Sequence, residues 1–296
     1  MVDVQKIYAV IVSYNPDIEL LSNLTKTSKQ VDKVLLFDNN SNADGLVLVK
    51  ECECIDNVEV IYSEANIGLS KAQNVAIKMA LSEGADWILT LDDDSDISDD
   101  FVNNMLSLNL ESRCDIGVIV PTVIDQNSDQ VSRFILSGHK FRKVTPLDKP
   151  LEVLVAISSG MLIHKNTFES VGFMNEDYFI DYIDIDFSLR VNERFKILSS
   201  PKSILQHKLG LKEKVTVLGV SFIVSNHSPF RRYHIYRNRI DLWKRHFKKF
   251  PKYVLYEICV SAIEAVRILL LEKNRKDNFV SICHGIVSSF RKETSK

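Results

Sequence analysis

The sequence predicts an α/β fold with a mostly parallel central sheet, and three observations support this prediction. Continuous apolar runs rich in β-branched residues recur through the first half of the chain, as expected for strands that are buried on both faces. Segments with helical spacing lie between these runs, which indicates successive βαβ units. The fourth run ends in an acidic tetrad at residues 92–95, the kind of place where open α/β sheets bind their ligands.

The predicted elements follow in chain order. Strands are expected at residues 7–12, 33–37, 58–62 and 87–91, and polar loops end the first three. Helices are expected at 17–28 and 69–82, and the second has apolar residues at helical spacing with Gly84 just beyond its end. Further strands are expected at 116–121 and 151–157, an apolar stretch follows at 161–163, and the chain becomes helical and basic from Pro229 onward.

The composition is that of a globular protein, with 296 residues of which 45% are hydrophobic and 26% charged. The five cysteines are scattered and odd in number, which argues against a disulfide framework and for a reducing compartment. The apolar stretch at 7–12 is too short for a signal peptide. No run reaches the length of a membrane span, because the best candidate, 254–271, is interrupted by Glu257, Glu264 and Arg267. These features predict a cytoplasmic protein.

The charge is unevenly distributed along the chain. Residues 231–296 carry 16 Lys and Arg against 6 Asp and Glu, which gives 16 − 6 = +10 and leaves −2 − 10 = −12 for the rest. We therefore predict a division into residues 1–230 and a basic helical extension, 231–296. Such a tail fits attachment to an anionic membrane surface, with nucleic acid or a solvated helical face as the competing explanations. A stripe within it favours core packing over membrane contact: Leu255, Ile258, Cys259, Ala262, Val266 and Leu269.

The tetrad Asp92-Asp93-Asp94-Ser95 suggests a metal site. Its carboxylates would repel one another unless a cation lay between them, and hard oxygen ligands favour a divalent ion. The alternative is a solvated acidic turn, since three further Asp residues follow by position 100. Polar loops follow the first three strands and are expected to meet the tetrad at one edge of the sheet: 13–16, 38–41 and 64–68. Neither G-x-G-x-x-G nor G-x-x-x-x-G-K-[ST] is present, which excludes an ordinary Rossmann dehydrogenase and a P-loop enzyme.

A second acidic segment spans residues 181–190. If its second half is helical, Asp186 and Arg190 stand four positions apart and can pair. Asp184 then lies at the helix start, where a carboxylate is favoured, as either a general base toward an acceptor hydroxyl or a simple N-cap. Farther on, residues 227–238 interleave Arg and Tyr, a set of donors suited to a diphosphate.

Short motifs therefore recur at the strand ends and in the loops between them. They are 9–16 (AVIVSYNP), 37–41 (FDNNS), 66–68 (NIG) with Ala72 and Asn74, 91–95 (LDDDS), Ser159-Gly160, 179–190 and 227–238. In order and spacing these motifs resemble the inverting family-two glycosyltransferases of the GT-A fold. The resemblance is greatest to the bacterial rhamnosyltransferase-like members that build surface polysaccharides. It covers roughly the first four-fifths of the chain.

The resemblance implies which residues do the chemistry. In this family the first and third Asp of such a motif bind a divalent metal on the donor diphosphate, so Asp92 and Asp94 are expected to bind Mg²⁺ or Mn²⁺. The family's base lies six positions before the Arg of the second motif, which is Asp184 (190 − 6 = 184). Ile183 replaces the acid that commonly precedes the base, with Asp181 as the nearest substitute. His207 is expected as a further metal ligand, with His227 as the alternative.

The donor site is expected to bind a nucleoside-diphosphate sugar. Asp38 resembles the family residue that reads a pyrimidine base. The full set of expected donor-binding residues is Ser13, Asn15, Asp38, Asn66, Gly68, Asn74, Asp93, Arg231, Arg232, Tyr236 and Arg237.

The resemblance implies transfer of a sugar such as rhamnose, from dTDP-rhamnose, with inversion. The implied acceptor is a lipid-linked glycan, and the enzyme is expected to lie peripherally at the inner face of the plasma membrane. No nucleic-acid partner is expected, and a homodimer is left open. Two other classes are considered. A sugar-nucleotide nucleotidyltransferase usually has a Gly-rich basic loop after the first strand, unlike residues 13–16. A non-catalytic sugar-nucleotide or glycan-binding module would not need Asp92, Asp94 and Asp184 together.

Overall fold

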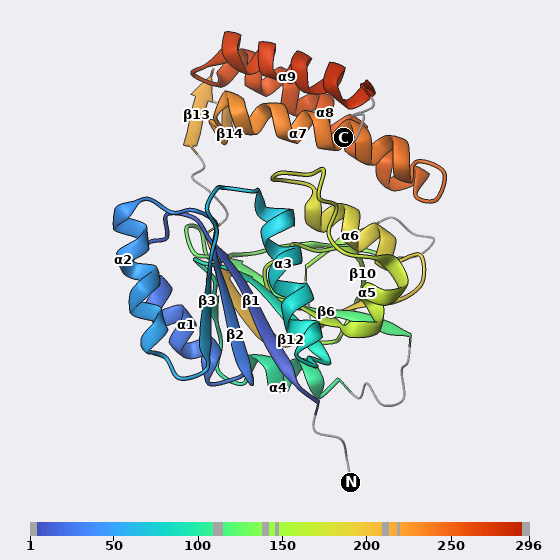
Figure 1. Ribbon diagram of the computed structural model, residues 1–296. Coiled ribbons are helices and arrows are strands. Elements are labelled where there is room, and N and C mark those ends of the chain that lie inside the picture. Colours follow the sequence, from blue (N-terminus) through green and yellow to red (C-terminus); the bar gives the residue numbers. More distant parts are fainter. Residues whose placement is uncertain are drawn as a thin grey trace. The chain divides into compact units, whose positions relative to one another are not determined.

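The chain forms two compact units (Figure 1). The computed structural model describes residues 5–108, 115–137, 142–145, 148–208, 213–217 and 220–291. The sheet unit comprises residues 1–179 and 183–209, and the helical unit comprises residues 180–182 and 210–296. The division falls earlier than the boundary predicted after residue 230, because the hairpin of β13 (Glu213–Val217) and β14 (Val220–Val224) packs with the helices.

One large mixed sheet organises the sheet unit. Its strands lie in the order β3 (Val58–Tyr62), β2 (Lys33–Asp38), β1 (Ile7–Ser13), β4 (Trp87–Asp92), β11 (Met161–His164), β6 (Ile116–Asp125), β12 (Lys196–His207), β10 (Glu152–Val155), β8 (Phe134–Leu136) and β9 (Lys143–Val144). Two short strands join it at the side, β5 (Asp96–Ile97) on β12 and β7 (Gln130–Val131) on β6.

The first four strands in chain order are parallel, as the alternation of strand and helix signals predicted. Their register aligns the ends: Ser13 lies opposite Asp38, and Val12 lies opposite Asp92. The polar residues that end these strands therefore meet at one edge of the sheet. The α/β fold of the prediction is confirmed, and its parallel part is the part that brings these strand ends together.

Beyond β4 the sheet becomes mixed. β11 is antiparallel to both of its neighbours, β4 and β6, whereas β12 runs parallel to β6. The pairing of β12 with β6 shifts register between Ser200 and Ile204, where Pro201 cannot donate a ladder hydrogen bond. This strand was not predicted, yet it ends at His207.

Helices and apolar side chains enclose the sheet. The helices are α1 (Leu20–Ser28), α2 (Ala43–Glu51) followed by the 3₁₀ turn η1 (Cys52–Cys54), α3 (Leu69–Ser82), α4 (Phe101–Leu106), α5 (Lys165–Val171) and α6 (Ile183–Val191). One core cluster joins side chains of β1, β2 and β4 to α1 and α4. The small residues Ala72, Ala76 and Ala80 of α3 are fully buried, so that this helix can lie close against β1 and β2. The predicted helix at 69–82 is confirmed to the residue.

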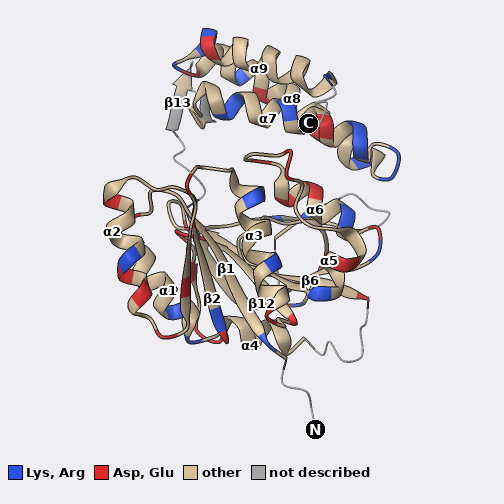
Figure 2. Cartoon of the chain, viewed as in Figure 1, with Lys and Arg blue, Asp and Glu red and all other residues tan. Residues whose placement is uncertain are grey.

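The helical unit consists of the β13–β14 hairpin, α7 (Pro229–His246), α8 (Pro251–Leu271) and α9 (Arg275–Phe290). Ser228 caps α7 by accepting a hydrogen bond from the Arg231 backbone N–H (3.3 Å), and Pro229 occupies the first turn. Figure 2 marks in blue the Lys and Arg positions along α7. Gly285 lets α9 approach α7 closely, since a Cβ there would lie 2.5 Å from the carbonyl oxygen of Tyr233.

The predicted stripe on α8 does not pack into a core. Leu255, Ile258, Cys259, Ala262, Val266 and Leu269 are all exposed. The helix instead turns Glu257 and Glu264 inward, where Glu257 accepts a hydrogen bond from the Tyr182 hydroxyl (3.1 Å) and Glu264 pairs with two arginines of α7. Leaving a buried charge without a partner costs more free energy than exposing apolar side chains to water. The ion pairs of Glu264 with Arg232 and Arg239 therefore set the orientation of the helix. Among the described residues, no helix combines the length and apolar character needed to cross a membrane.

Candidate active site

A cluster of carboxylates and one imidazole lies where β4, β5 and β12 meet. β4 ends at Asp92, a tight turn carries the rest of the tetrad, and β5 begins at Asp96. β5 pairs antiparallel with the end of β12, with Asp96 opposite Gln206. This register places the next residue, His207, beside the turn that holds Asp94.

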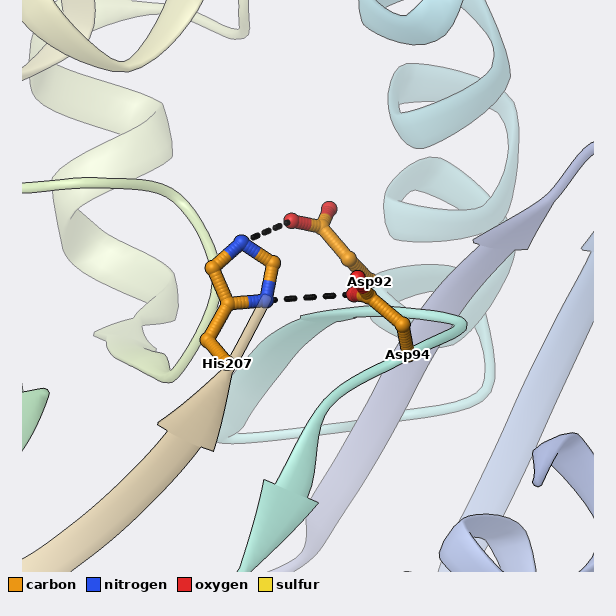
Figure 3. A group of neighbouring side chains, drawn as sticks. All are labelled: Asp92, Asp94 and His207. Carbon is orange, nitrogen blue, oxygen red and sulfur yellow. Dashed lines mark ion pairs between the residues drawn. The ribbon is translucent and has the colours of Figure 1, made fainter. Parts of the chain in front are cut away.

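The three side chains face one another (Figure 3). His207 Nδ1 lies 3.1 Å from Asp94 Oδ1, and His207 Nε2 lies 3.7 Å from Asp92 Oδ2. One ligand atom from each of the three residues falls within 4.8 Å of the others. Asp94 Oδ1 is buried and makes no aligned hydrogen bond within the described residues. Two carboxylate oxygens and one imidazole nitrogen at these distances form a donor set that fits a divalent cation.

The electrostatics of the cluster also favour a cation. Burial raises the pKa of Asp92, and the nearby Asp94 raises it further, against an opposing effect of His207. Burial lowers the pKa of His207, but Asp94 and Asp92 outweigh it and the net shift is upward. Burial and the charge of Asp92 raise the pKa of Asp93 to about 7, although Asp93 Oδ2 accepts a hydrogen bond from the Tyr14 backbone N–H (3.3 Å). The negative charge of this turn is therefore incompletely compensated by protein groups.

Two buried serines fix the turn that carries the carboxylates. The hydroxyls of Ser95 and Ser159 lie 2.5 Å apart, and both are within hydrogen-bonding distance of the Asp92 backbone N–H (3.2 and 3.3 Å). The next residue, Gly160, has φ +85°, and a Cβ there would lie 2.6 Å from Pro121 Cγ. Sequence reasoning matched Ser159-Gly160 to the family without assigning it a task, and the structure shows that it positions the turn.

The loop after β2 presents a buried acceptor next to a buried hydroxyl. Asp38 Oδ2 accepts a hydrogen bond from the Ser41 backbone N–H (3.1 Å), whereas Asp38 Oδ1 and Ser13 Oγ are buried without a hydrogen-bond partner in the described chain. Both residues end parallel neighbouring strands and face each other in register. Buried polar atoms normally have partners, so this pair is a candidate contact for a ligand.

Side-chain amides tie the first three loops together. Asn15 Oδ1 accepts from the Asn42 backbone N–H (2.7 Å), and the Asn15 N–H donates to Ser41 Oγ (2.8 Å). Asn39 Nδ2 donates to Asn66 Oδ1 (3.0 Å), which also accepts from the Gly68 backbone N–H (3.0 Å). The structure thus brings Ser13, Asn15, Asp38, Asn66 and Gly68 to one edge of the sheet.

Asn74 and Gly68 have identifiable structural tasks. The Asn74 amide donates to the Met174 carbonyl (2.9 Å) and to Glu176 (2.9 Å), and its oxygen accepts from the Met174 N–H (3.0 Å). Its hydrogen bonds therefore hold the 174–176 loop and leave little capacity for a ligand. Gly68 has φ +85°, and a Cβ there would lie 2.7 Å from the ring of Phe179.

Asp184 occupies the first turn of α6 and borders a pocket of about 230 Å³. The pocket wall is mainly apolar, with two cationic side chains; its members include Val123, Phe134, Ile135, Val155, Ile157, Arg133 and Lys143. The predicted pair Asp186–Arg190 forms (2.9 Å), and the Arg190 guanidinium also donates to the carbonyls of Val171 and Phe173. Asp186 and Arg190 thus pair with each other, whereas Asp184, whose Oδ1 accepts a hydrogen bond from the Ile185 backbone N–H (2.8 Å), borders a space that a ligand could enter.

The remaining predicted residues lie in the helical unit. Arg231 forms a two-pronged pair with Asp181 (2.9 Å for each bond), so the Asp181 carboxylate is engaged with this arginine. Arg232 is completely buried between Glu264 (2.8 Å) and Glu272 (2.5 Å). These contacts give Arg232 a structural role rather than one at a donor.

Tyr236, Arg237 and His227 complete the helical set. Tyr236 is buried in the small apolar cluster of this unit, and Arg237 is partly exposed on α7. Burial, with Arg231 and Arg232 nearby, lowers the pKa of His227 to about 4. Of the two histidines considered as metal ligands, His207 lies in the carboxylate cluster.

Comparison with known sequences identifies the family. The family described as Glycosyl transferase family 2 matches residues 8–172, which is more than half of the chain. The chain belongs to glycosyl transferase family 2. It is 32% identical over 275 residues to the dTDP-rhamnosyl transferase RfbF of Shigella flexneri, covering 91% of this chain and 90% of that protein. It is 24% identical over 192 residues to the low-salt glycan biosynthesis hexosyltransferase Agl10 of Haloferax volcanii, about 60% of each chain.

Solved glycosyltransferases share the fold. GalNAc-T7, solved with UDP, GalNAc and Mn²⁺, superposes with a TM-score of 0.62 at 15% identity, over 97% of this chain and 58% of that one. The mannosyltransferase PcManGT from Pyrobaculum calidifontis, solved with GDP-Man and Mn²⁺, gives 0.57 at 10% identity, over 97% and 74%. S. aureus TarS 1-349 with UDP-GlcNAc gives 0.53 at 16% identity, over 96% and 72%. The family-two chain described here therefore has the predicted GT-A fold, and it is a glycosyltransferase.

Proposed function

We propose that this glycosyltransferase moves rhamnose, with inversion, from dTDP-rhamnose to a growing lipid-linked glycan. The observation that carries the proposal is the cluster of Asp92, Asp94 and His207 at the strand ends. It lies in the same unit as the pocket that Asp184 borders. The 32% identity to a dTDP-rhamnosyl transferase over nearly the whole chain supports the choice of donor.

Asp92, Asp94 and His207 would hold the divalent ion. When bound, such an ion neutralises charge on the leaving diphosphate. Mg²⁺ strongly prefers oxygen ligands, whereas transition ions accept an imidazole nitrogen more readily. We therefore expect Mn²⁺ to bind more tightly than Mg²⁺, in line with the Mn²⁺ in the solved structures of GalNAc-T7 and PcManGT.

The loops after β1 and β2 would bind the nucleotide. A thymine base carries one ring N–H, and Asp38 Oδ1 is a buried acceptor that lacks a partner in the described chain. Ser13 lies opposite Asp38 on the neighbouring strand, and its Oγ can hydrogen-bond to a base oxygen. Asn15, Asn66 and Gly68 would shape the surrounding loops, and Asp93 would lie beneath the ribose or diphosphate. For Arg231 and Arg237, contact with the diphosphate stays a prediction from the family resemblance.

Asp184 would act as the general base. The acceptor hydroxyl would give its proton to the Asp184 carboxylate while its oxygen forms a bond to the anomeric carbon and the bond from that carbon to the diphosphate breaks. A single displacement of this kind inverts the anomeric configuration. The apolar pocket wall suits the faces of a sugar ring, and Arg133 and Lys143 in that wall suit an anionic group on the acceptor.

The acceptor would be presented at the inner face of the plasma membrane. The excess of +10 charge in residues 231–296 would attract anionic lipid at about 1 kcal/mol per basic residue close to the surface, less at high salt.

A donor panel tests the proposal. Purified protein is freed of metal, and release of nucleoside diphosphate from dTDP-rhamnose, UDP-GlcNAc and GDP-mannose is measured with and without Mn²⁺ in the presence of lipid-linked glycan. The proposal expects Mn²⁺-dependent release of dTDP from dTDP-rhamnose, with the product in the inverted configuration by NMR. Turnover restricted to another donor would refute the choice of sugar. Formation of a nucleotide sugar from a nucleoside triphosphate would assign the protein to the nucleotidyltransferases.

A further inference from the structure

The outer face of α8 is apolar from Leu255 to Leu270. Eight residues on it are exposed: Leu255, Ile258, Cys259, Ala262, Ile263, Val266, Leu269 and Leu270. At 3.6 residues per turn these positions span an arc of about 140°, and none of them is charged. The exposed fractions of Ile263 (62%), Val266 (55%) and Leu270 (62%) show that these side chains extend away from the rest of the chain.

The inner face of the same helix is polar. Glu264 pairs with Arg232 (2.8 Å) and Arg239 (2.6 Å), and Ser261 accepts a hydrogen bond from Arg239 (2.9 Å). A helix on a water-soluble domain has the reverse arrangement, with its apolar stripe toward the core and its charges outside. Helices that contact lipid turn their polar groups toward the protein and their apolar groups toward the lipid. The helix α8 has this arrangement.

Exposed apolar residues are concentrated in this part of the molecule. Of the 19 large apolar residues exposed among the described residues, 12 lie between Phe230 and Phe290, a stretch of 61 positions, and 7 lie in the rest. Single exposed apolar residues are ordinary, but a contiguous face of them marks a surface that something covers.

The charges at the two ends of α8 indicate what covers it. Lys248, Lys249 and Lys252 are exposed at its start, and Lys273, Arg275 and Lys276 are exposed just past its end. Asp277 is the one exposed acidic residue in the described stretch 247–277. A second copy docked through this face would place cations against cations in either orientation, which is unfavourable. An anionic surface with an apolar interior complements both the ends and the middle.

We propose that α8 lies in the interface of an anionic lipid bilayer, with the apolar arc among the upper acyl chains and the basic ends at the headgroups. Because Glu257 and Glu264 occupy its other face, the helix lies along the membrane surface rather than through it. This inference rests on the proposed function, because contact with the membrane would give the enzyme access to a lipid-linked acceptor. The apolar face of α8 is the surface that would make the contact.

Native cysteines allow a direct test. Cys259 lies in the apolar arc, and Cys54 is also exposed but lies in the sheet unit. Two full-length variants are made, and each retains the buried Cys52 together with either Cys54 or Cys259. The three remaining cysteines of each variant are replaced by Ser. The thiol carries an environment-sensitive fluorophore, and vesicles contain phosphatidylglycerol with phosphatidylcholine, or phosphatidylcholine alone. A blue shift and quenching by spin-labelled lipid are expected at Cys259 with anionic vesicles, and no change at Cys54.

Two results would overturn the inference. One is an unchanged spectrum at Cys259 with anionic vesicles, or an equal change at Cys54. The other is a blue shift at Cys259 without lipid that grows with protein concentration, which would assign the face to contact between copies of the chain.

A pair of substitutions tests the apolar contribution separately. Ile263→Gln with Val266→Gln should reduce partitioning into anionic vesicles by at least about tenfold, because two buried aliphatic side chains are lost. The control is Val47→Gln on α2, with 57% exposure in the sheet unit, which should leave partitioning unchanged. Thermal unfolding should match the parent in both proteins, since all three side chains are exposed. Equal partitioning of parent and double variant would refute insertion.

Activity separates this inference from the proposed function. Release of dTDP from dTDP-rhamnose with a soluble acceptor should be the same in the double variant and the parent. If no donor is turned over but Cys259 still enters lipid, the proposed function fails and the docking surface stands. If transfer proceeds but the Cys259 spectrum does not change, the docking surface alone fails.

Discussion

His207 Nδ1 lies 3.1 Å from Asp94 Oδ1, although 207 − 94 = 113 positions separate the two residues in sequence. The contact depends on sheet register, because the short strand β5 pairs with the end of β12 and so fixes the loop between β4 and β5 against it. A site assembled from two distant segments in this way is held by the core beneath it, and not by local sequence.

Asp184→Asn should slow transfer by roughly 10²- to 10⁴-fold, because the amide keeps the shape of the side chain but cannot accept the proton. Steady-state release of dTDP gives the rate, and calorimetric titration with dTDP gives the donor-site affinity, which should stay unchanged. The control is Asp44→Asn, which removes an exposed acid in the first turn of α2, far from the pocket in sequence. Undiminished turnover in Asp184→Asn would exclude this residue as the base.

Asn74→Ala should reduce the free energy of unfolding by about 1–3 kcal/mol, because it leaves buried groups of the 174–176 loop without hydrogen bonds. Urea unfolding measures this loss, and Asn103→Ala, on the exposed side of α4, is the control. The folded variant should bind dTDP as the parent does. Normal stability combined with lost dTDP binding would restore the donor contact first expected for Asn74.

Arg232→Met should destabilise the helical unit by about 3–5 kcal/mol, because it removes the arginine that pairs with the buried Glu272 carboxylate, whereas Glu264 keeps its pair with Arg239. Arg231→Met is the matched control, since its pair with Asp181 is partly exposed and should contribute less than about 1 kcal/mol. Far-UV circular dichroism during thermal unfolding reports both. The same Arg231 variant tests the predicted diphosphate contact: dTDP affinity equal to that of the parent would remove Arg231 from the donor site.

Cys52 should resist alkylation, because burial raises the pKa of its thiol to about 11. At pH 8 about one molecule in a thousand would carry the reactive thiolate, and the fraction would rise as the pH approaches 11. Peptide mass spectrometry after iodoacetamide treatment should find Cys54 modified and Cys52 intact in the folded protein, with both modified in urea. Rapid modification of native Cys52 at pH 8 would contradict the packing of η1 against β3.

The sequence allowed the parallel half of the sheet and its strand ends to be predicted, for a physical reason. Strands buried on both faces are continuous apolar runs, and α3 has a clean apolar periodicity that ends near Gly84. These local signals place Asp38 and Asp92 at the same sheet edge without any knowledge of long-range contacts.

The rest of the site depends on contacts that local patterns do not encode. β12 contains Pro201 and several Ser residues, so it lacks an apolar run, and the strand that ends at His207 was not predicted. The role of Arg232 was also hidden, since its partners Glu264 and Glu272 are more than 30 positions away. For α8 the apolar periodicity was predicted correctly, but the apolar stripe was expected in the core and is exposed. The ion pairs of Glu264 with Arg232 and Arg239 decide the orientation of this helix.

Metal binding by Asp92, Asp94 and His207 is the step on which we expect transfer to depend. Its most direct test measures dTDP release from dTDP-rhamnose by metal-free protein across a Mn²⁺ titration, for the parent, Asp94→Ala, His207→Ala and the nearby exposed control Asp99→Ala. We predict saturable Mn²⁺ activation in the parent and in Asp99→Ala, no turnover in Asp94→Ala, and at least about a tenfold weaker Mn²⁺ response in His207→Ala. Full activity of Asp94→Ala in buffer containing EDTA would show that transfer does not depend on a metal at this site.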